Sequence, residues 1–542
     1  MKPSSWNLGC LLLVLLLSLS PYPICAKQQS SSDKAYVTLL YGDEFLLGVR
    51  VLGKSIRDTG STKDMVALIS DGVSPYAKKL LKADGWIVEP ITLLANPNKV
   101  RPQRFWGVYT KLKIFNMTNY KKVVYLDADT IVVKSIEDLF KCGKFCANLK
   151  HSERLNSGVM VVEPSATVFS DMMSKVNTLQ SYTGGDQGFL NSYYKEFPNA
   201  RLFEPNIPLE VVESKPAPEM ERLSTLYNAD VGLYMLANKW MVDESKLHVI
   251  HYTLGPLKPW DWWTSWLVKP VGVWQDAREK LDETLPGTGG GRDPTDELIV
   301  KLLIVLPLFT FLFCYYRSFL QTRSLAGHFR HLCYTFRFRT ILPYSAVSSS
   351  PTLNSNQLVL ASYSKVPPFL GGLSVFVCFT SVLSALAISF LIIPRQTMPW
   401  TGLLLMYEWT FTIFILLFAS YLHLVQRWGM LTANRLGSIS SDVESGHNDD
   451  SSKGHQMQGS CSFDDVTLYY LLGFAVLSIF TLSLPSLLGI TALFLKLGLM
   501  VAGGLILASF MTYAAEHLGI RSFMKGLDDR DASRRKNICL LC

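Results

Sequence analysis

The chain has 542 residues, of which 49% are hydrophobic, and its mean hydropathy is +0.20. This composition excludes an ordinary soluble protein and indicates membrane-spanning segments. The formal net charge of +8 requires no nucleic-acid partner, because much of the excess lies in the apolar C-terminal half, where basic residues orient membrane spans.

Five parts are expected in chain order. The N-terminus carries Lys2, an apolar run from Leu11 to Leu17 and small residues near Ala26, which is typical of a signal peptide or of an uncleaved anchor. A globular domain of ordinary composition follows, and then a linker rich in glycine and proline. The parts are the signal segment 1–26, the domain 27–285, the linker 286–297, a membrane region 298–516 and a basic tail 517–542.

The membrane region contains five apolar stretches of the length that a bilayer requires. Arginine and lysine gather in the segments 317–368 and 425–465 and in the tail, so the positive-inside rule places these in the cytosol. An odd number of spans then places the N-terminal domain in the lumen, in agreement with a signal peptide. The predicted spans are 298–316, 370–393, 400–424, 467–490 and 491–513.

Strand-like and helix-like segments alternate within residues 27–285. Apolar, β-branched runs at 35–41, 64–69 and 86–90 are separated by helix-like stretches at 46–56 and 77–83. A further helix, predicted over 110–117, leads into a strand that ends at Leu126. The alternation predicts an α/β domain with a largely parallel, doubly wound, Rossmann-like sheet. Ligands of such sheets bind beyond the carboxyl ends of the strands.

Asp127 and Asp129 come directly after this buried strand. Strand alternation turns both carboxylates to one face, where they repel each other unless a cation lies between them. Mg²⁺ and Mn²⁺ prefer such oxygen ligands and commonly hold phosphates. The pair therefore indicates a site for the diphosphate of an activated sugar. The alternative is a pair of aspartates that only cap the next turn.

Three further clusters follow. Asn156-Ser157-Gly158 precedes a buried strand, and the glycine-rich turn 184–188 is expected to expose Asp186 and Gln187 at its tip. The third cluster runs from the histidines at 248 and 251 to Lys258-Pro-Trp. Each cluster alone has an ordinary structural explanation. In this order, and together with Asp127 and Asp129, they resemble the glycosyltransferase family 8 domain over about residues 34–275.

The resemblance implies a GT-A fold, a UDP-sugar donor bound through Mn²⁺, and transfer with retention of configuration. Asp127, Asp129 and His251 would hold the metal. Lys258, Asp186 and Gln187 would be catalytic, with Lys258 on the diphosphate and the other two facing the transferred sugar. The residues that would bind the donor are Thr38, Leu39, Lys111, Asn156, Gly185 and Gly255. Thr183 departs from the aspartate that glycogenin-like chains carry there, which indicates a different sugar or acceptor.

A family 8 domain followed by several spans is similar to plant glucuronosyltransferases of sphingolipid synthesis. This resemblance implies transfer of glucuronic acid from UDP-glucuronate to the inositol headgroup of inositol phosphorylceramide at the Golgi membrane, with the domain lumenal. Arg101, Arg104 and Arg154 are candidates for binding the donor carboxylate. The four tryptophans between 260 and 266 would stack on sugar, lie at the membrane surface or form a packed cluster.

Several alternatives stay open from the sequence. The chain could use another UDP-sugar or act on a polysaccharide such as xylan, or it could be a sugar-binding membrane receptor without activity. Cys142 and Cys146 form either a small disulfide or two buried thiols. Asn116-Met-Thr is the sequon for N-glycosylation. Glu408, inside a predicted span, is either functional or close to the membrane surface.

Overall fold

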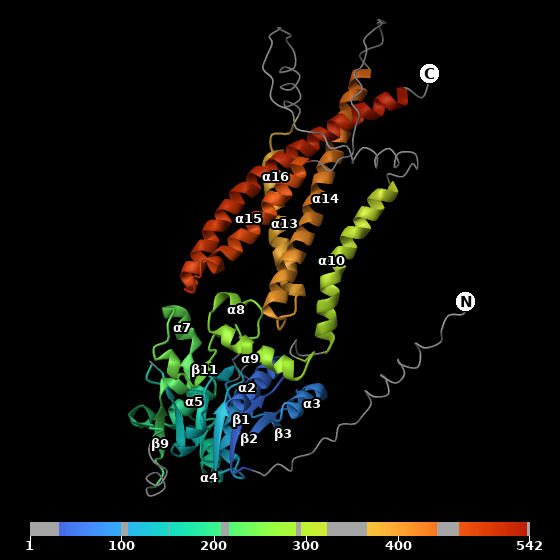
Figure 1. Cartoon of the computed structure of the whole chain (residues 1–542). Helices are drawn as coiled ribbons and strands as arrows, with labels where there is room; N and C mark the ends of the chain where they lie inside the picture. Colours follow the sequence, from blue (N-terminus) through green and yellow to red (C-terminus); the bar gives the residue numbers. More distant parts are fainter. Residues whose placement is uncertain are drawn as a thin grey trace, which may run out of the picture.

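The computed structural model describes residues 32–98, 107–150, 152–206, 216–288, 294–321, 366–441 and 465–538. Figure 1 shows an N-terminal α/β domain beneath a group of long helices. The predicted signal segment, Arg101, Arg104 and most of the two predicted cytosolic loops lie outside the described residues.

The domain is built on an eight-stranded sheet with the order β3-β2-β1-β4-β7-β6-β9-β8. Strands β3, β2, β1 and β4 are parallel, as predicted, whereas β7 runs antiparallel to both β4 and β6. The short connection between β6 and β7 enforces this hairpin, since a parallel pair needs a crossover of about a dozen residues. The strands are β1 Lys34–Leu40, β2 Asp64–Ile69, β3 Ile87–Pro90, β4 Lys122–Leu126, β6 Phe145–Leu149, β7 Leu155–Val162, β8 Arg201–Leu202 and β9 Met220–Leu223.

Helices cover both faces of this sheet, and alternation along β1 divides the core between them. Tyr36 and Leu40 pack into the layer that includes α2, whereas Val37 and Leu39 pack into the layer that includes η3 and α5. The helix predicted over 110–117 is a 3₁₀-helix. The helical segments of the domain are η1 Asp43–Phe45, α2 Leu46–Asp58, α3 Pro75–Ala83, η3 Val108–Asn116, η4 Glu137–Lys141, α4 Ala166–Lys175, α5 Asp186–Tyr193, η5 Phe197–Asn199, η6 Thr225–Tyr227, α7 Val231–Ala237, η7 Glu244–Lys246, α8 Thr264–Leu267 and α9 Val271–Thr284.

A second, three-stranded sheet positions the residues that follow β4. It has the order β10-β11-β5, with β10 at Ala229–Asp230, β11 at Val249–His251 and β5 at Thr130–Val132. In the antiparallel pair of β11 and β5, His251 lies opposite Thr130. This register brings a histidine from far along the chain beside Asp129.

The C-terminal half consists of the long helices α10 Pro294–Gln321, α13 Leu370–Ile392, α14 Pro399–Ser441, α15 Asp465–Leu487 and α16 Leu493–Ile538. Within the described residues, four segments are long and apolar enough to cross a bilayer: Leu370–Ile392, Pro399–Ala433, Val466–Leu487 and Leu493–Asp528. The predicted fold class, an α/β domain followed by a helical membrane region, is confirmed. The fifth predicted span, in α10, is not among the four. The first turns of α10 contain the charged residues Asp296, Glu297 and Lys301. This span stays a prediction.

The joins between paired helices lie against the α/β domain (Figure 1). The guanidinium of Arg395, between α13 and α14, lies 2.8 Å from the carboxylate of Asp261. Between α15 and α16, Thr491 accepts a hydrogen bond of 3.1 Å from Asn238. The ring centroids of Trp266 and Trp400 are 4.5 Å apart. The domain and the membrane helices are therefore packed together at several points.

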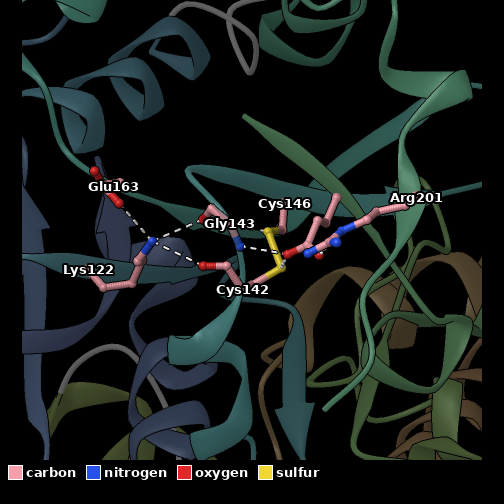
Figure 2. The surroundings of a disulfide bond; sticks show 7 residues. Lys122, Cys142, Gly143, Cys146, Glu163 and Arg201 are labelled. Atoms are coloured by element: carbon pink, nitrogen blue, oxygen red, sulfur yellow. Dashed lines mark hydrogen bonds and ion pairs between the residues drawn. A yellow bond between two sulfur atoms is a disulfide. The ribbon is translucent and has the colours of Figure 1, made fainter. Parts of the chain in front are cut away.

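The alternative between a disulfide and two thiols is resolved in the domain. Cys142 and Cys146 form a disulfide at the entry to β6 (Figure 2). The adjoining loop is held by Lys122, whose Nζ donates to the carbonyl oxygens of Cys142 and Gly143 at 3.1 and 3.0 Å. Asn116 of the sequon is exposed at the end of η3. Glu408, which was expected inside a span, lies in α14.

Candidate active site

A cleft of about 910 Å³ opens beyond the carboxyl ends of β1 and β4. This is where ligands of a doubly wound sheet bind. Of the predicted site residues, those that line it are Leu39, Lys111, Asp127, Asp129, Gly185, Asp186, Gln187, Gly255 and Lys258. Thr38, Asn156 and His251 are buried behind them. The four motifs that are spread over the sequence therefore converge on one place.

Asp127, Asp129 and His251 form a group whose ligand atoms all lie within 4.8 Å of one another. The Nε2 atom of His251 is 3.4 Å from a carboxylate oxygen of Asp129 and 3.9 Å from one of Asp127. Two carboxylates and one imidazole are a donor set that suits a divalent transition-metal ion. The residues therefore fit the predicted metal site.

Asn228 determines which nitrogen of His251 faces the carboxylates. Its side-chain oxygen lies 3.0 Å from His251 Nδ1, while its amide nitrogen donates to Asn156 Oδ1 at 2.8 Å. Because the Asn228 oxygen can only accept, Nδ1 carries the proton in the neutral ring and the Nε2 lone pair points to the carboxylates. Such support of the second ring nitrogen is typical of metal-binding histidines.

Gly158 makes room for this histidine. A Cβ atom at residue 158 would lie 2.1 Å from His251 Cε1 and 2.5 Å from its Nδ1. Both distances are far below van der Waals contact, and the ring is anchored by Asn228. The Asn-Ser-Gly motif therefore contributes an amide that supports the histidine network and a glycine that the ring requires.

Lys111 links the metal group to Asp186. Its Nζ lies 3.0 Å from Asp127 Oδ1 and 3.1 Å from Asp186 Oδ2. Burial alone would lower the pKa of Lys111, but the two carboxylates raise it above its ordinary value. The buried ammonium therefore stays charged and offsets the repulsion between the two acids. Tyr125 also donates to Asp127 Oδ1, at 2.8 Å.

Lys258 lies on the opposite side of the metal group, with its Nζ 2.7 Å from Asp129 Oδ2. Burial would raise the pKa of Asp129, but Lys258 and His251 hold it well below its ordinary value. Gly255, earlier in the same loop, has a φ of +64°, which a residue with a side chain rarely adopts. A cation thus stands beside the site where the sequence motif predicts a diphosphate.

Asp186 begins helix α5 and is buried, so the prediction that its carboxylate is exposed at a turn tip is wrong. The carboxylate turns inward because Ser157 Oγ donates to it at 2.7 Å and Lys111 pairs with it. Thr183 accepts hydrogen bonds from the backbone N–H groups of Gly185 and Gly188, at 3.2 and 3.0 Å. The residue that departs from the family motif therefore shapes the turn that carries Asp186.

Two further predictions concern Arg154 and the tryptophan segment. Arg154 is exposed and stacks on Tyr182 at 4.1 Å. Trp260 packs against Phe45 and Trp274. Trp262 and Trp263 contact Phe390 of α13, and Trp266 contacts Trp400 of α14. The segment is thus a packed cluster against the membrane helices, and Trp260 is its one ring among the residues lining the cleft.

Sequence reasoning missed Asn228, because a lone asparagine before a short strand carries no motif. It also missed Arg395 and Gln396, which line the cleft from the join between α13 and α14. Gln396 donates to the Glu44 carbonyl at 3.0 Å, and Arg278 donates to the Gln396 carbonyl. Their position between two predicted spans could have indicated this role, because a short connection between two spans lies at the membrane surface.

The comparisons with known proteins agree with this geometry. The model of the family described as Glycosyl transferase family 8 matches residues 36–144. The chain belongs to glycosyltransferase family 8. It is 65% identical to inositol phosphorylceramide glucuronosyltransferase 1 of Arabidopsis thaliana, in a match that covers 100% of this chain and 99% of that protein.

More distant matches cover only part of the chain. A putative UDP-glucuronate:xylan alpha-glucuronosyltransferase 3 of Arabidopsis thaliana is 33% identical over 42% of this chain and 35% of that protein. The solved structure of the galactosyltransferase LgtC with donor and acceptor sugar analogs covers 45% of this chain and 94% of its own, at 17% identity and a TM-score of 0.32.

Proposed function

We propose that the chain transfers glucuronic acid from UDP-glucuronate to the inositol headgroup of inositol phosphorylceramide. The observation that carries the proposal is the 65% identity along the full length to a protein named for this activity. The xylan enzymes match less than half of the chain, which disfavours a polysaccharide acceptor. The intact group of Asp127, Asp129 and His251 beside Lys258 disfavours a receptor without activity.

Asp127, Asp129 and His251 would hold Mn²⁺, which when bound neutralises phosphate oxygens of the donor. Lys258 stabilises the negative charge that develops on the leaving nucleoside diphosphate. Asp186 stabilises the positive charge on the sugar carbon or attacks it transiently, and Gln187, which lines the same cleft, orients the sugar. Lys111 binds the donor and offsets the repulsion between the carboxylates of Asp127 and Asp186.

The catalytic domain would lie in the Golgi lumen, with α10 as the fifth span. Both helix-pair joins lie against the domain, so α13 runs toward the domain and begins on the far side of the membrane. The chain between Asp296, which lines the cleft, and the start of α13 must then cross the bilayer once. α10 is the described helix in that interval, and its apolar side chains from Leu302 to Phe313 are largely exposed.

Purified full-length protein in detergent tests the proposal. Transfer to inositol phosphorylceramide is measured with Mn²⁺ and with UDP-glucuronate, UDP-glucose or UDP-galactose. We expect transfer of glucuronic acid that is lost on chelation and in the isosteric variant Asp127→Asn. Transfer of another sugar would overturn the donor assignment, and hydrolysis of UDP-glucuronate without transfer would overturn the acceptor. An absence of both reactions in folded protein would favour the receptor.

A further inference from the structure

The catalytic cleft extends beyond the donor-binding motifs onto residues of the membrane region. Ile299 of α10, Ile392 at the end of α13 and Arg395 in the following join all line it. Ile392 is the last residue of a candidate span, so this side of the cleft lies at the membrane boundary. None of these residues belongs to a motif for binding a nucleotide sugar. The cleft thus has a second portion that the donor does not explain.

Arg395 is the cation of this second portion. Its Nε and Nη2 atoms donate to the two oxygens of Asp261 at 3.1 and 2.8 Å, and its guanidinium lies 5.5 Å from the ring centroid of Trp263. Asp261 is buried, yet the Arg395 side chain is 62% exposed. Its Nη1 atom has no protein partner among the described residues. The Arg395 guanidinium is therefore held in a fixed orientation, and some of its N–H groups remain available to a ligand.

The other cations among the described residues of the cleft are already engaged by the catalytic acids. Lys111 is buried between Asp127 and Asp186, and Lys258 contacts Asp129. Arg395 is therefore the cation of the described cleft that is available to an anionic group other than the donor diphosphate. A planar guanidinium with unused N–H groups matches a phosphate oxygen pair.

We propose that Arg395 binds the phosphodiester of the acceptor lipid, at an acceptor site built jointly by the catalytic domain and the membrane helices. Glu44 and Asp296 also line the cleft; their carboxylates accept hydrogen bonds from the polyol and repel the phosphate toward Arg395. Ile299 and Ile392 contact the first carbons of the lipid chains. The ligand class is an anionic polyol-phosphate lipid, and this inference rests on the proposed function for its choice of acceptor.

Fixing Arg395 through Asp261 gives the site an advantage in affinity. A free arginine side chain loses conformational entropy when it binds a ligand. A guanidinium that a carboxylate and an aromatic ring already hold in place loses much less. Asp261 Oδ2 also accepts from the backbone N–H of Lys258 at 3.1 Å. The phosphate-binding arginine and the catalytic lysine therefore share one support, which aligns acceptor and donor.

Direct binding and kinetics of the full-length protein in detergent test this site. Binding of inositol phosphorylceramide is titrated by intrinsic tryptophan fluorescence, with phosphatidylinositol as a lipid that shares the headgroup and ceramide as one that lacks the phosphate. We expect the two phosphate lipids to compete and ceramide not to bind. In Arg395→Gln the Kd for both should rise about tenfold or more, the loss that removal of one charge-assisted contact produces.

The outcomes separate the inference from the proposed function. If inositol phosphorylceramide binds through Arg395 but receives no sugar, the proposed function fails and the inference stands. If transfer occurs and Arg395→Gln binds the lipid as the parent does, the inference is overturned. A parallel rise in the KM values for lipid and for UDP-glucuronate also overturns it, because that result assigns Arg395 only to support of Lys258.

Two further variants complete the test. The double variant Arg395→Gln with Asp261→Asn removes the buried charge that the single variant leaves unpaired, and it should show the same loss of lipid binding. Lys269→Gln removes an exposed cation that lines a separate hollow of about 310 Å³ and should bind the lipid normally. Free inositol phosphate that binds as well as the lipid would show that the isoleucines contribute nothing, and would overturn the lipid part of the site.

Discussion

The Nδ1 atom of His251 lies 3.0 Å from the side-chain oxygen of Asn228. In Asn228→Ala this anchor is lost and the ring is free to rotate or to change tautomer. We expect the Mn²⁺ concentration required for half-maximal activity to rise about 10- to 100-fold, which is the usual loss when a residue that orients a metal-binding histidine is removed. Asn199→Ala, on the exposed surface, is the matched control. Unchanged metal dependence in Asn228→Ala would rule out the anchoring role.

Gly158→Ala should displace the same histidine by a steric route. The added Cβ would meet the ring of His251 at 2.1 Å, so either the ring or the β7 backbone must move. We expect metal-dependent turnover to fall about 100-fold or more, because ångström-scale misplacement at a catalytic centre costs about that much. Gly272→Ala has open space at its Cβ and serves as the control, with activity equal to that of the parent.

Removal of the Lys258 charge should affect turnover. Lys258→Met removes the ammonium that we propose to face the leaving diphosphate, and the loss of one preorganised donor costs about 10²–10³ in kcat. Steady-state kinetics with UDP-glucuronate measure this directly. A change in KM alone, with kcat preserved, would show that Lys258 binds the donor equally in the ground and transition states.

The disulfide between Cys142 and Cys146 should contribute to stability without being required for catalysis. It closes a loop of five residues, for which loop-closure entropy predicts about 2 kcal/mol. The variant Cys142→Ser/Cys146→Ser should therefore unfold at a temperature lower by about 4–8 °C, while its kcat stays near that of the parent. Loss of activity at a temperature where the variant is still folded would contradict this assignment.

Glycosylation reports the orientation of the domain. Asn116 is exposed, and oligosaccharide is added only on the lumenal side of the membrane. We expect a glycosidase to reduce the apparent mass of the protein isolated from the membranes of a eukaryotic host, and Asn116→Gln to remove that shift. Protease protection of the domain in sealed vesicles is the independent measurement, and digestion from the cytosolic side would contradict the lumenal assignment.

The sequence predicted best those features that local chemistry determines. The runs that became β1, β2 and β4 bury every residue but Lys34, so their composition alone marks them as interior strands. The position of Asp127 and Asp129 beyond β4 follows directly. The Asn156–Gly158 motif meets Asp127 because β7 begins beside the end of the antiparallel strand β4, whereas His251 reaches the same place from the second sheet, through the pairing of β11 with β5.

Features that depend on distant packing were not predictable. The inward turn of Asp186 requires Ser157 and Lys111, neither of which is close to it in sequence. Asn228 acquires its role only when β10 and β11 pair. Arg395 reaches the cleft because the join between α13 and α14 packs against the catalytic domain. Its partner there, Asp261, lies 134 positions earlier in the chain. No local sequence pattern predicts a contact between residues so far apart in the chain.

The packing of the tryptophan segment on the membrane helices has a consequence for acceptor choice. A Cβ atom at Gly402 would lie 2.5 Å from the Trp262 ring, and Trp266 contacts Trp400, so the domain rests directly on the first turn of α14. The reactive centre is thereby mounted at a fixed height above the bilayer. If the acceptor is a membrane lipid, as proposed, we expect the enzyme to select lipids whose headgroup carries its hydroxyl at that distance from the bilayer.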